Sequence, residues 1–240
     1  MTKKQNKIAI FDIDGTIFRK NLHFELIDEL VWMKVFPKEV RNQLVKLYSN
    51  WLEHRGTYEA YRQGTVNVYA KYIKGRTKED VQKASTLLMP FYKNKTYVFA
   101  ENLIVKLKKE GYHIVAISGS PIEVVEEYNR QHLKFEKVFG SVYDMDKSGR
   151  YTGESEFEPC KHKGATLKQY VFENGLTLEG SYGIGDTESD ASFLELVTNP
   201  IAFNPNQNLK DMAVKKGWKI VVEKKDVVYQ IDCTGGKCDL

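Results

Sequence analysis

Five short apolar runs separated by helical patterns constrain the fold of this 240-residue chain more than any other feature. The runs occupy residues 7–11, 113–117, 182–184, 200–203 and 219–222. Strands that alternate with helices are typical of a parallel sheet that carries helices on both faces. The sequence therefore predicts an α/β fold built on a doubly wound parallel sheet.

The first two predicted strands are separated by a long stretch whose pattern is helical throughout. Apolar residues recur there at three- and four-residue spacing, and Pro37, Gly56 and Gly75 divide the stretch into four helices. These helices are expected at 22–36, 38–52, 57–73 and 78–92, and those of the core at 98–109, 121–133, 163–173, 189–197 and 208–216. We predict that residues 17–95 form a helical cap, hinged at both ends, inserted into a core made of residues 1–16 and 96–240.

The charged residues form no concentrated patch. The formal net charge is +4, and basic pairs such as Lys108-Lys109 and Lys215-Lys216 fall on polar faces, which indicates solvated surface rather than a nucleic-acid-binding face. No run approaches the roughly 18 apolar residues that a membrane span requires, and the first residues lack the apolar core of a signal peptide. We therefore expect a cytoplasmic protein without a nucleic-acid or membrane partner.

The three cysteines are too few for a disulfide framework. Cys233 and Cys238 could pair within the glycine-rich tail, but the sequence favours two unpaired thiols there. The five histidines stand apart, so no cluster of histidine and cysteine indicates a zinc site.

Two carboxylates directly follow the first predicted strand, in the stretch FDIDGT (residues 11–16). Side chains two positions apart on a strand share a face, so Asp12 and Asp14 would project together at the edge where open α/β sheets bind ligands. Two such charges repel by about 4 kcal/mol at a separation of about 4 Å and an effective dielectric of about 20. Asp186 and Asp190, after the third predicted strand, would reach the same edge, and oxygen ligands of this kind suit Mg²⁺.

An anion site is predicted where the second strand ends, in the stretch SGSP (residues 118–121). The Ser118 hydroxyl, backbone N–H groups at a helix start and the close approach that Gly119 permits would suit a phosphate. Taken alone, Ser118 could be an ordinary helix cap, but its place at the same sheet edge favours the phosphate site. Positive charge would come from Lys163, with Lys161 in reserve, at the start of a later helix.

Four motifs, DIDGT, the strand-terminal SGS, the KG at a helix start and GIGDTESD, resemble in order and spacing those of the haloacid dehalogenase superfamily of phosphotransferases. The resemblance covers the entire core. The helical insertion after the first motif resembles the cap of the phosphoserine phosphatase-like branch, and residues 195–205 resemble its broader subfamily IB hydrolases. The resemblance implies a Mg²⁺-dependent phosphomonoester hydrolase that acts on a small phosphorylated metabolite through an aspartyl-phosphate.

The resemblance also implies roles for the residues that meet the substrate. Asp12 would be the nucleophile, and Asp14 would protonate the leaving alcohol and then deprotonate the attacking water. Lys163 and Ser118, next to Gly119, would hold the transferring oxygens.

The implied metal set is Asp12, Asp14 through its carbonyl, Asp186 and Asp190, and Mg²⁺ would neutralise the charge of the phosphate. Asp190 would either orient the lysine or contact the metal through water. Thr16 would bind phosphate or steady the loop.

Two other functions use similar residues. A phosphotransferase would pass the aspartyl-phosphate to another alcohol with the same apparatus. A receiver-like module would carry a phosphorylated aspartate without catalysis, but receiver domains lack the paired carboxylates and the helical insertion.

The substrate is less constrained than the chemistry. Phosphoserine phosphatases carry a glutamate nine positions after the nucleophile, where this chain has Asn21, and a neutral amide cannot pair with an ammonium as a carboxylate does. Phosphoserine is therefore expected to be one substrate among several. The aromatic residues of the predicted cap are expected to pack the bundle rather than to face the substrate; they are Trp51, Tyr58, Tyr61, Tyr69 and Tyr72.

Overall fold

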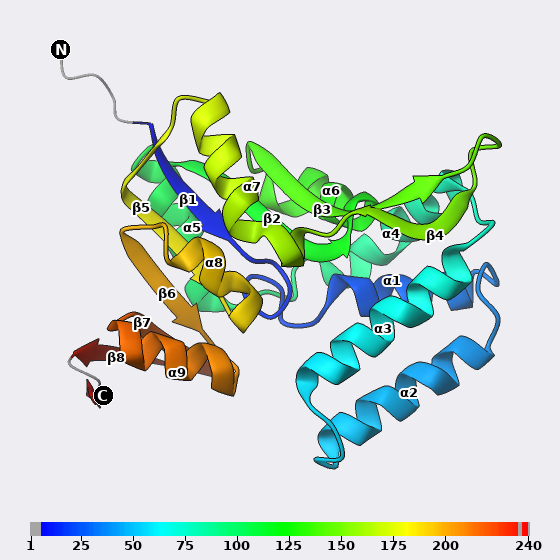
Figure 1. Cartoon of the computed structure of the whole chain (residues 1–240), viewed down its shortest axis with the longest axis horizontal. Helices are drawn as coiled ribbons and strands as arrows, with labels where there is room; N and C mark the ends of the chain where they lie inside the picture. The colour runs from blue at the N-terminus through cyan, green and yellow to red at the C-terminus, as the bar shows by residue number, and fades with distance from the viewer. Residues whose placement is uncertain (1–5, 235–236, 240) are drawn as a thin grey trace.

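The computed structural model describes residues 6–234 and 237–239, which form one mixed β-sheet flanked by helices (Figure 1). The strands are β1 (Lys7–Phe11), β2 (His113–Pro121), β3 (Lys137–Met145), β4 (Tyr151–Phe157), β5 (Thr177–Gly185), β6 (Asn199–Phe203), β7 (Lys219–Lys224), β8 (Val227–Thr234) and β9 (Lys237–Asp239). The helices are α1 (Leu22–Trp32), α2 (Glu39–Leu52), α3 (Tyr58–Ile73), α4 (Lys78–Tyr92), α5 (Val98–Lys109), α6 (Ile122–Tyr128), α7 (Pro159–Glu173), α8 (Ala191–Leu194) and α9 (Gln207–Lys216). A π-helical turn, η1 (Asn129–Leu133), extends α6, and a 3-10 turn, η2 (Glu188–Asp190), precedes α8.

The strand order is β4-β3-β2-β1-β5-β6-β7-β8-β9. Neighbouring strands from β3 to β7 in this order run parallel, whereas β4, β8 and β9 join the two edges in antiparallel orientation. The five predicted strands are β1, β2, β5, β6 and β7, at the centre of the sheet. The predicted α/β fold with a doubly wound parallel sheet is therefore confirmed.

The sequence pattern does not predict the outer strands at the two ends of the sheet, β3 and β4 at one end and β8 and β9 at the other. β3 and β4 form a hairpin whose turn is closed by a hydrogen bond from Gly149 N to Asp146 O of 3.0 Å, and Tyr151 is the one fully buried residue of β4. Central parallel strands are buried on both faces and read as apolar runs, whereas edge strands need few apolar residues. A search for apolar runs therefore misses them.

Alternation along β1 supplies both faces of the sheet with core residues. Ala9 and Phe11 pack in the apolar cluster shared with α5, α6 and the cap, whereas Ile8 and Ile10 pack with Leu167 of α7 and with α8 and α9. Figure 1 shows α7, α8 and α9 together on the near face of the sheet. Each fully buried side chain of this size contributes about 1.5–3 kcal/mol, so the two-residue period of the strand holds both helix layers in place.

The two connections between the core and the helical insertion lie side by side. Arg19 N donates to Lys95 O at 2.9 Å, and Tyr97 N donates to Ile17 O at 2.9 Å. Beyond them, α1 and α4 pack on each other and on the core helix α6, within the same apolar cluster as the sheet. α2 and α3 extend from this base as a helical pair (Figure 1). The apolar core is thus continuous from the sheet into the first and last helices of the insertion.

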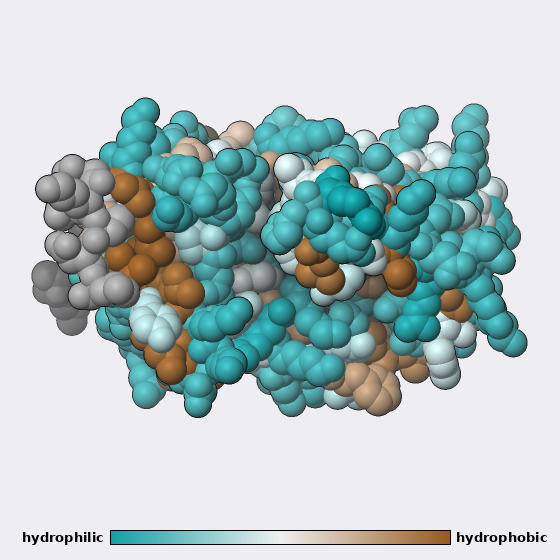
Figure 2. All heavy atoms as spheres, turned by 90° about the horizontal axis from the view of Figure 1, so that it is seen from below, coloured by the Kyte–Doolittle hydropathy of each residue, from teal (hydrophilic) through white to brown (hydrophobic). Residues whose placement is uncertain are grey.

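The surface seen in Figure 2 is largely hydrophilic, with an apolar strip at one end of the molecule. Val227 and Val228 of β8 are among the exposed apolar residues. The lysine pairs named from the sequence are exposed, as expected for solvated surface. No helix in the described part of the chain is both long and apolar enough to cross a membrane.

The expectation of an unpaired thiol at Cys233 is wrong, because Cys233 is disulfide-bonded. β9 returns along β8 with Cys233 opposite Cys238 in the backbone register, a pairing that the tail sequence does not signal. The side chain of Cys238 lies outside the described part of the structure. Cys160 is the free cysteine of the described residues.

Candidate active site

The first strand delivers the acidic motif to the carboxyl edge of the sheet. Asp12 continues the pairing of β1 with β5, since its N–H donates to Ile184 O at 2.9 Å. The chain then turns at Gly15, whose φ of +85° is a conformation that glycine adopts without steric cost. A Cβ at this position would overlap Oδ2 of Asp186. Glycine is therefore needed here both for the turn and for the close approach of the two loops.

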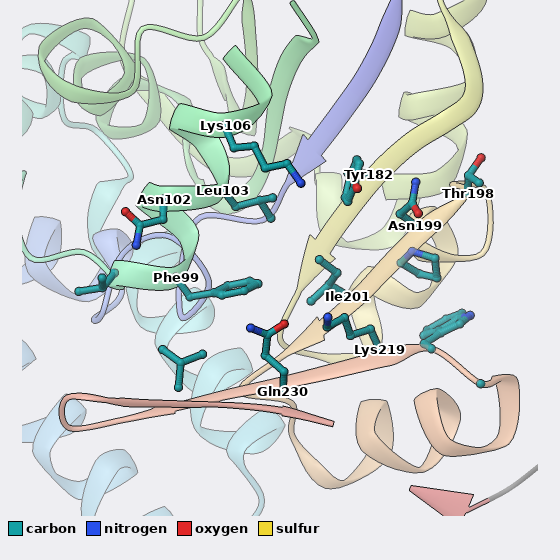
Figure 3. Close-up of a pocket in the computed structure, with 15 residues that line it drawn as sticks. Phe99, Asn102, Leu103, Lys106, Tyr182, Thr198, Asn199, Ile201, Lys219 and Gln230 are labelled. Carbon is teal, nitrogen blue, oxygen red and sulfur yellow. The ribbon is translucent and has the colours of Figure 1, made fainter. Parts of the chain in front are cut away.

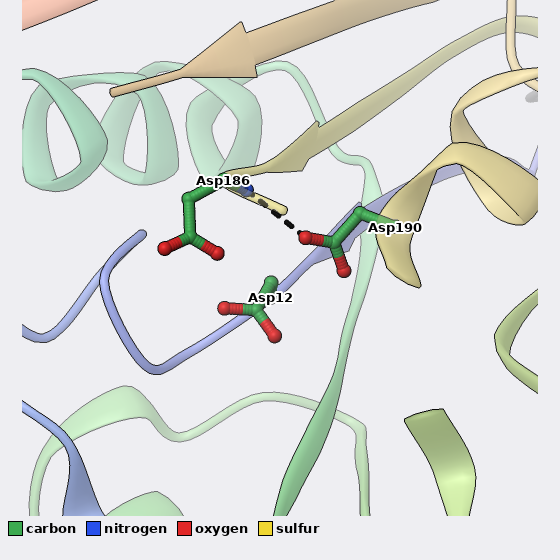
Figure 4. A group of neighbouring side chains, drawn as sticks. All are labelled: Asp12, Asp186 and Asp190. Atoms are coloured by element: carbon green, nitrogen blue, oxygen red, sulfur yellow. Dashed lines mark hydrogen bonds between the residues drawn. The ribbon is translucent and has the colours of Figure 1, made fainter. Parts of the chain in front are cut away.

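Three carboxylates gather where these loops meet (Figure 4), and oxygens of Asp12, Asp186 and Asp190 lie within 4.8 Å of one another. Burial raises the pKa of Asp12 to about 7. Burial, together with Asp12 and Asp190, raises the pKa of Asp186 well above its usual range. Buried carboxylates this close to one another ionise fully only when cations neutralise them. The cluster therefore has the electrostatics of a cation site.

One ammonium is buried among these carboxylates. Lys163 is 1% exposed, and its Nζ lies 2.7 Å from Oδ1 of Asp12 and 2.5 Å from Oδ1 of Asp190. Burial alone would lower the pKa of Lys163, but the two carboxylates raise it well above its ordinary value, so the lysine stays charged. Lys161 lies exposed on the surface. Lys163 is therefore the lysine that reaches the site.

The Asp14 carboxyl points away from this cluster, toward hydroxyl groups. Its Oδ2 accepts hydrogen bonds from Oγ of Ser118 (2.6 Å) and Ser120 (2.7 Å), and its Oδ1 accepts one from Leu22 N (2.6 Å) at the start of α1. Burial raises the pKa of Asp14, and these hydrogen bonds oppose the rise. Asp14 is thus placed between the sheet edge and the cap.

The predicted phosphate loop differs in detail from the expectation of a helix start. Residues 118–121 extend β2, which still pairs with β3 at Pro121, and α6 begins at Ile122. Ser118 is fully buried and caps no helix; its hydroxyl bonds Asp14 and accepts from Ser120 N at 2.9 Å. The loop therefore presents Gly119 and Ser120 to the site, with Ser118 behind them.

A small space of about 40 Å³, here named the inner cavity, lies over these groups. The core lines it with Asp12, Asp14, Gly119, Ser120, Cys160, Lys163, Asp186, Thr187 and Ser189, and the cap lines it with Asn21, His23, Phe24, Tyr58, Arg62 and Val66. Thr16, Ser118 and Asp190 are not among the lining residues. Thr16 is buried in the loop, and its hydroxyl has no hydrogen-bond partner among the described residues.

Three residues of the site were not singled out by sequence reasoning. Ser120 belongs to the SGS motif but was given no role, although it bonds Asp14 as closely as Ser118 does. His23 and Arg62 face the inner cavity from the cap, and nothing in the local pattern distinguishes them from surface residues of a helix. Their placement follows from the packing of the cap on the core.

Three of the five aromatic residues named for the cap both pack on one another and line a cleft. Tyr69 is buried in the apolar cluster. Trp51, Tyr58 and Tyr61 contact one another, with Trp51 stacked on Tyr61 at 5.7 Å between ring centroids. The same three rings also line a cleft of about 950 Å³ that reaches Asp186.

A separate groove of about 750 Å³ lies between α5 and strands β6 to β8 (Figure 3). Its lining includes Lys106 and Lys219 but no carboxylate, histidine or cysteine. Among the described residues, the groove has no acidic side chain beside its lysines, whereas the cluster under the cap combines carboxylates with a buried lysine. That cluster is therefore the candidate active site.

The chain is similar in sequence or in fold to several known proteins. The family model described as haloacid dehalogenase-like hydrolase matches residues 9–195. The phosphoserine phosphatase of Methanocaldococcus jannaschii is 26% identical over 227 residues, which cover 94% of this chain and 96% of the relative. The histidinol-phosphatase of Neisseria meningitidis is 24% identical over 229 residues, which cover 89% of this chain and 97% of the relative. A solved structure of a Bordetella pertussis protein of unknown function has a TM-score of 0.73 at 21% identity, covering 90% of this chain and 98% of that chain.

Proposed function

Because the chain belongs to the haloacid dehalogenase-like hydrolases and is a phosphatase of that type, we propose that it hydrolyses a small phosphomonoester with Mg²⁺ through a phosphorylated Asp12. Two relatives that match along nearly their whole length are named as phosphatases of phosphoserine and of histidinol phosphate. Both names support a small metabolite as the substrate.

The main support for this proposal is the hydrogen bonding of the two Asp12 carboxylate oxygens. Lys163 holds its Oδ1, whereas Oδ2 is buried and has no hydrogen-bond partner in the described part of the chain. A buried acceptor without a partner costs about 1–3 kcal/mol, and the cost is removed when a ligand arrives. Attack by Oδ2 on phosphorus would form the bond to Asp12 and break the ester P–O bond.

Asp14 suits the two proton transfers that this reaction needs. Its raised pKa allows the carboxyl to hold a proton closer to neutral pH than an exposed aspartate does, so it can protonate the departing alkoxide. The resulting carboxylate can then accept the proton of the water that hydrolyses the aspartyl-phosphate.

Asp12, Asp186 and the backbone carbonyl of Asp14 offer the oxygen donors that would hold Mg²⁺. When bound, the cation neutralises negative charge on the phosphoryl group. Lys163 adds a second positive charge beside Asp12. We propose that Asp190 is a positioning residue, because one of its oxygens bonds Lys163 and the other accepts from the backbone of the Asp186 loop.

Hydrolysis of an aryl phosphate by purified protein, with and without Mg²⁺, tests the proposal. Asp12→Asn keeps the shape and removes the nucleophilic charge, so activity should fall to background. Asp211→Asn, in an exposed carboxylate of α9, is the matched control and should retain full activity. Full activity of the Asp12 variant, or of protein freed of metal by chelation and dialysis, would overturn the mechanism.

An added alcohol separates hydrolysis from phosphotransfer, since both would pass through the same aspartyl-phosphate. With glycerol present, a hydrolase should release inorganic phosphate in proportion to substrate consumed. Stoichiometric glycerol phosphate, with little free phosphate, would identify a transferase instead.

The cap does not offer an ammonium group a carboxylate partner in the inner cavity. The side chain of Asn21 is occupied as the N-cap of α1, where its Oδ1 accepts from His23 N at 3.0 Å and from Phe24 N at 3.3 Å. The acidic residues that line the cavity, Asp12, Asp14 and Asp186, all belong to the core and not to the cap. We therefore propose that phosphoserine is accepted without being privileged. A hundredfold preference for phosphoserine in kcat/KM, about 2.7 kcal/mol of discrimination, would contradict this.

A further inference from the structure

The inner cavity is too small to hold a complete substrate. Its volume is about 40 Å³, and one water molecule needs at least about 10–15 Å³ of such space, so it has room for about three waters. A phosphoryl group and the ester oxygen fill a space of that size. The rest of the leaving group must lie elsewhere.

A second space, here named the outer cavity, adjoins the inner one. Its volume is about 480 Å³, within the range of about 300–1,000 Å³ that small-molecule sites occupy. The two cavities share six residues in their linings: Arg62, Val66, Gly119, Cys160, Thr187 and Ser189. A Cβ on Gly119 would overlap Sγ of Cys160, so a glycine is required where the two cavities adjoin.

The outer cavity lies on the side from which a leaving group would depart. Gly119 stands between Ser118 and Ser120, the two serines that hold Asp14, which is the proposed proton donor to the leaving oxygen. The aromatic cleft of about 950 Å³ adjoins the inner cavity at Phe24, Tyr58, Asp186 and Thr187. It therefore reaches Asp186, a proposed metal ligand, and not Gly119, whereas the outer cavity reaches Gly119 and not Asp186. The leaving group is therefore expected in the outer cavity.

The walls of the outer cavity are rich in neutral hydrogen-bonding groups. α3 contributes Gln63 and Asn67, which bond each other through Gln63 Nε2 and Asn67 Oδ1 at 3.1 Å. No hydrogen bond from the amide N–H groups of Asn67 occurs within the described residues, so both can donate to a ligand. Ser141 and Ser155 of the β3–β4 hairpin donate to Gly119 O (2.8 Å) and to a strand carbonyl (3.2 Å), and their oxygens remain able to accept.

Four of the five charged groups of the outer cavity form two ion pairs, and the fifth, Glu188, accepts hydrogen bonds from neutral amides. Arg62 Nε donates to Glu59 at 2.7 Å in a two-pronged contact, and Lys161 pairs with Glu158 at 2.8 Å. Glu188 accepts hydrogen bonds from the side-chain amides of Asn206 and Asn208, which lower its pKa in opposition to its burial. A ligand here therefore meets few unpaired charges and many amides and hydroxyls.

We propose that the outer cavity receives an uncharged, hydroxyl-rich leaving group, so that the preferred substrates are phosphomonoesters of polyols or sugars. This rests on the proposed function, because it assumes that the phosphoryl group is transferred to Asp12. The relevant chemistry is hydrogen bonding from α3 and the β3–β4 hairpin to hydroxyl groups several atoms away from phosphorus.

A series of phosphomonoesters tests the proposal with the wild-type protein and Mg²⁺. Glycerol, erythritol and hexitol phosphates extend one hydroxylated chain, n-hexyl phosphate keeps the length without hydroxyls, and glucose 6-phosphate and glucosamine 6-phosphate differ by an amine. We expect kcat/KM to rise at least tenfold from glycerol to hexitol phosphate and to be at least tenfold lower for hexyl phosphate. A flat or falling series, equal use of hexyl phosphate, or preference for the amine would overturn it.

Two matched variants assign the effect to the outer cavity. Asn67→Leu removes the amide with little change of volume, and Asn102→Leu does the same in the separate groove beside α5. Asn67→Leu should raise KM for hexitol phosphate about tenfold more than KM for phenyl phosphate, which has no hydroxylated chain, and Asn102→Leu should change neither. Equal effects of the two variants would refute the assignment. Absence of phenyl phosphate hydrolysis in the wild type with Mg²⁺ would instead refute the proposed function.

Discussion

Nζ of Lys163 lies 2.5 Å from Oδ1 of Asp190, and both side chains are almost completely shielded from solvent. The pair lies behind Asp12, which the same ammonium contacts at 2.7 Å. Lys163 thus contacts two of the three carboxylates of the acidic cluster, which consists of Asp12, Asp186 and Asp190. Because buried carboxylates are destabilised without a positive partner, the stability of this cluster depends on the Lys163 ammonium.

Asp190→Asn should weaken both the fold and the reaction. An asparagine oxygen can still accept from the loop backbone, but the contact with Lys163 loses its charge, and hydrogen bonds to charged groups contribute about 1.5–3 kcal/mol. We expect the free energy of unfolding in urea to fall by about that amount and kcat to fall with little change in KM. The exposed Asp211→Asn is the control, and a variant as stable and active as the wild type would show that Asp190 does not position the lysine.

Mg²⁺ affinity should fall as the pH is lowered below 7. Without metal, burial holds the pKa of Asp12 near 7, so below that pH a proton must leave before the carboxylate can bind a cation. For one coupled proton, the apparent affinity changes about tenfold per pH unit in that range. Calorimetric titration in buffers of different ionisation enthalpy measures the proton release, and pH-independent binding between pH 5.5 and 7 would contradict the prediction.

The central sheet and the acidic cluster follow from local sequence, because their signals are short-range. Apolar runs specify β1 and β5, and the residues directly after them, Asp12 and Asp186, must meet at one edge once those strands pair in parallel. Local sequence does not distinguish Lys163 from Lys161, because both lysines lie within one helical turn. The packing of α7 against the sheet decides that Lys163 is the buried one.

The rest of the site depends on packing that no local pattern records. Arg62 faces the inner cavity because α3 lies along β4, and β4 is itself an edge strand with little apolar content. Ser118 points to Asp14 because β2 continues past its expected end at residue 117, as far as Pro121. The sequence therefore predicts the residues proposed for phosphoryl transfer, but it does not predict those around the proposed leaving group.

Ser120→Ala should shift the alkaline limb of the pH–rate profile upward. Ser118 and Ser120 both donate to Oδ2 of Asp14, and these hydrogen bonds favour the carboxylate. Loss of one of them raises the pKa of Asp14 further, so the protonated acid that the leaving group needs persists to higher pH. The control is Ser141→Ala, whose hydroxyl bonds Gly119 O instead. An unshifted limb would mean that Asp14 is not the acid that this limb reports.

His23 should make the folded protein sensitive to mild acid. It is 4% exposed and packs edge-on against Tyr69, with ring centroids 4.7 Å apart. Burial, assisted by the charge of Arg62, lowers the pKa of His23 to about 3, compared with about 6.5 in an unfolded chain. Between these values the unfolded chain binds a proton that the folded chain does not. The stability contributed by His23 is therefore complete above about pH 6.5 and is lost as the pH falls.

His23→Phe retains an aromatic ring against Tyr69 and removes this titration. At pH 5 the wild type should have lost about 2 kcal/mol through His23, from about 1.5 pH units at about 1.36 kcal/mol each. Urea unfolding at pH 7.5 and pH 5 should therefore show a wild-type loss larger than that of His23→Phe by about this amount, while exposed His162→Phe behaves as the wild type. The buried carboxylates oppose the trend in all three proteins and cancel in the comparison. If the wild type and His23→Phe lose the same free energy of unfolding between pH 7.5 and pH 5, the imidazole of His23 is protonated in the folded protein with an ordinary pKa, and the prediction is wrong.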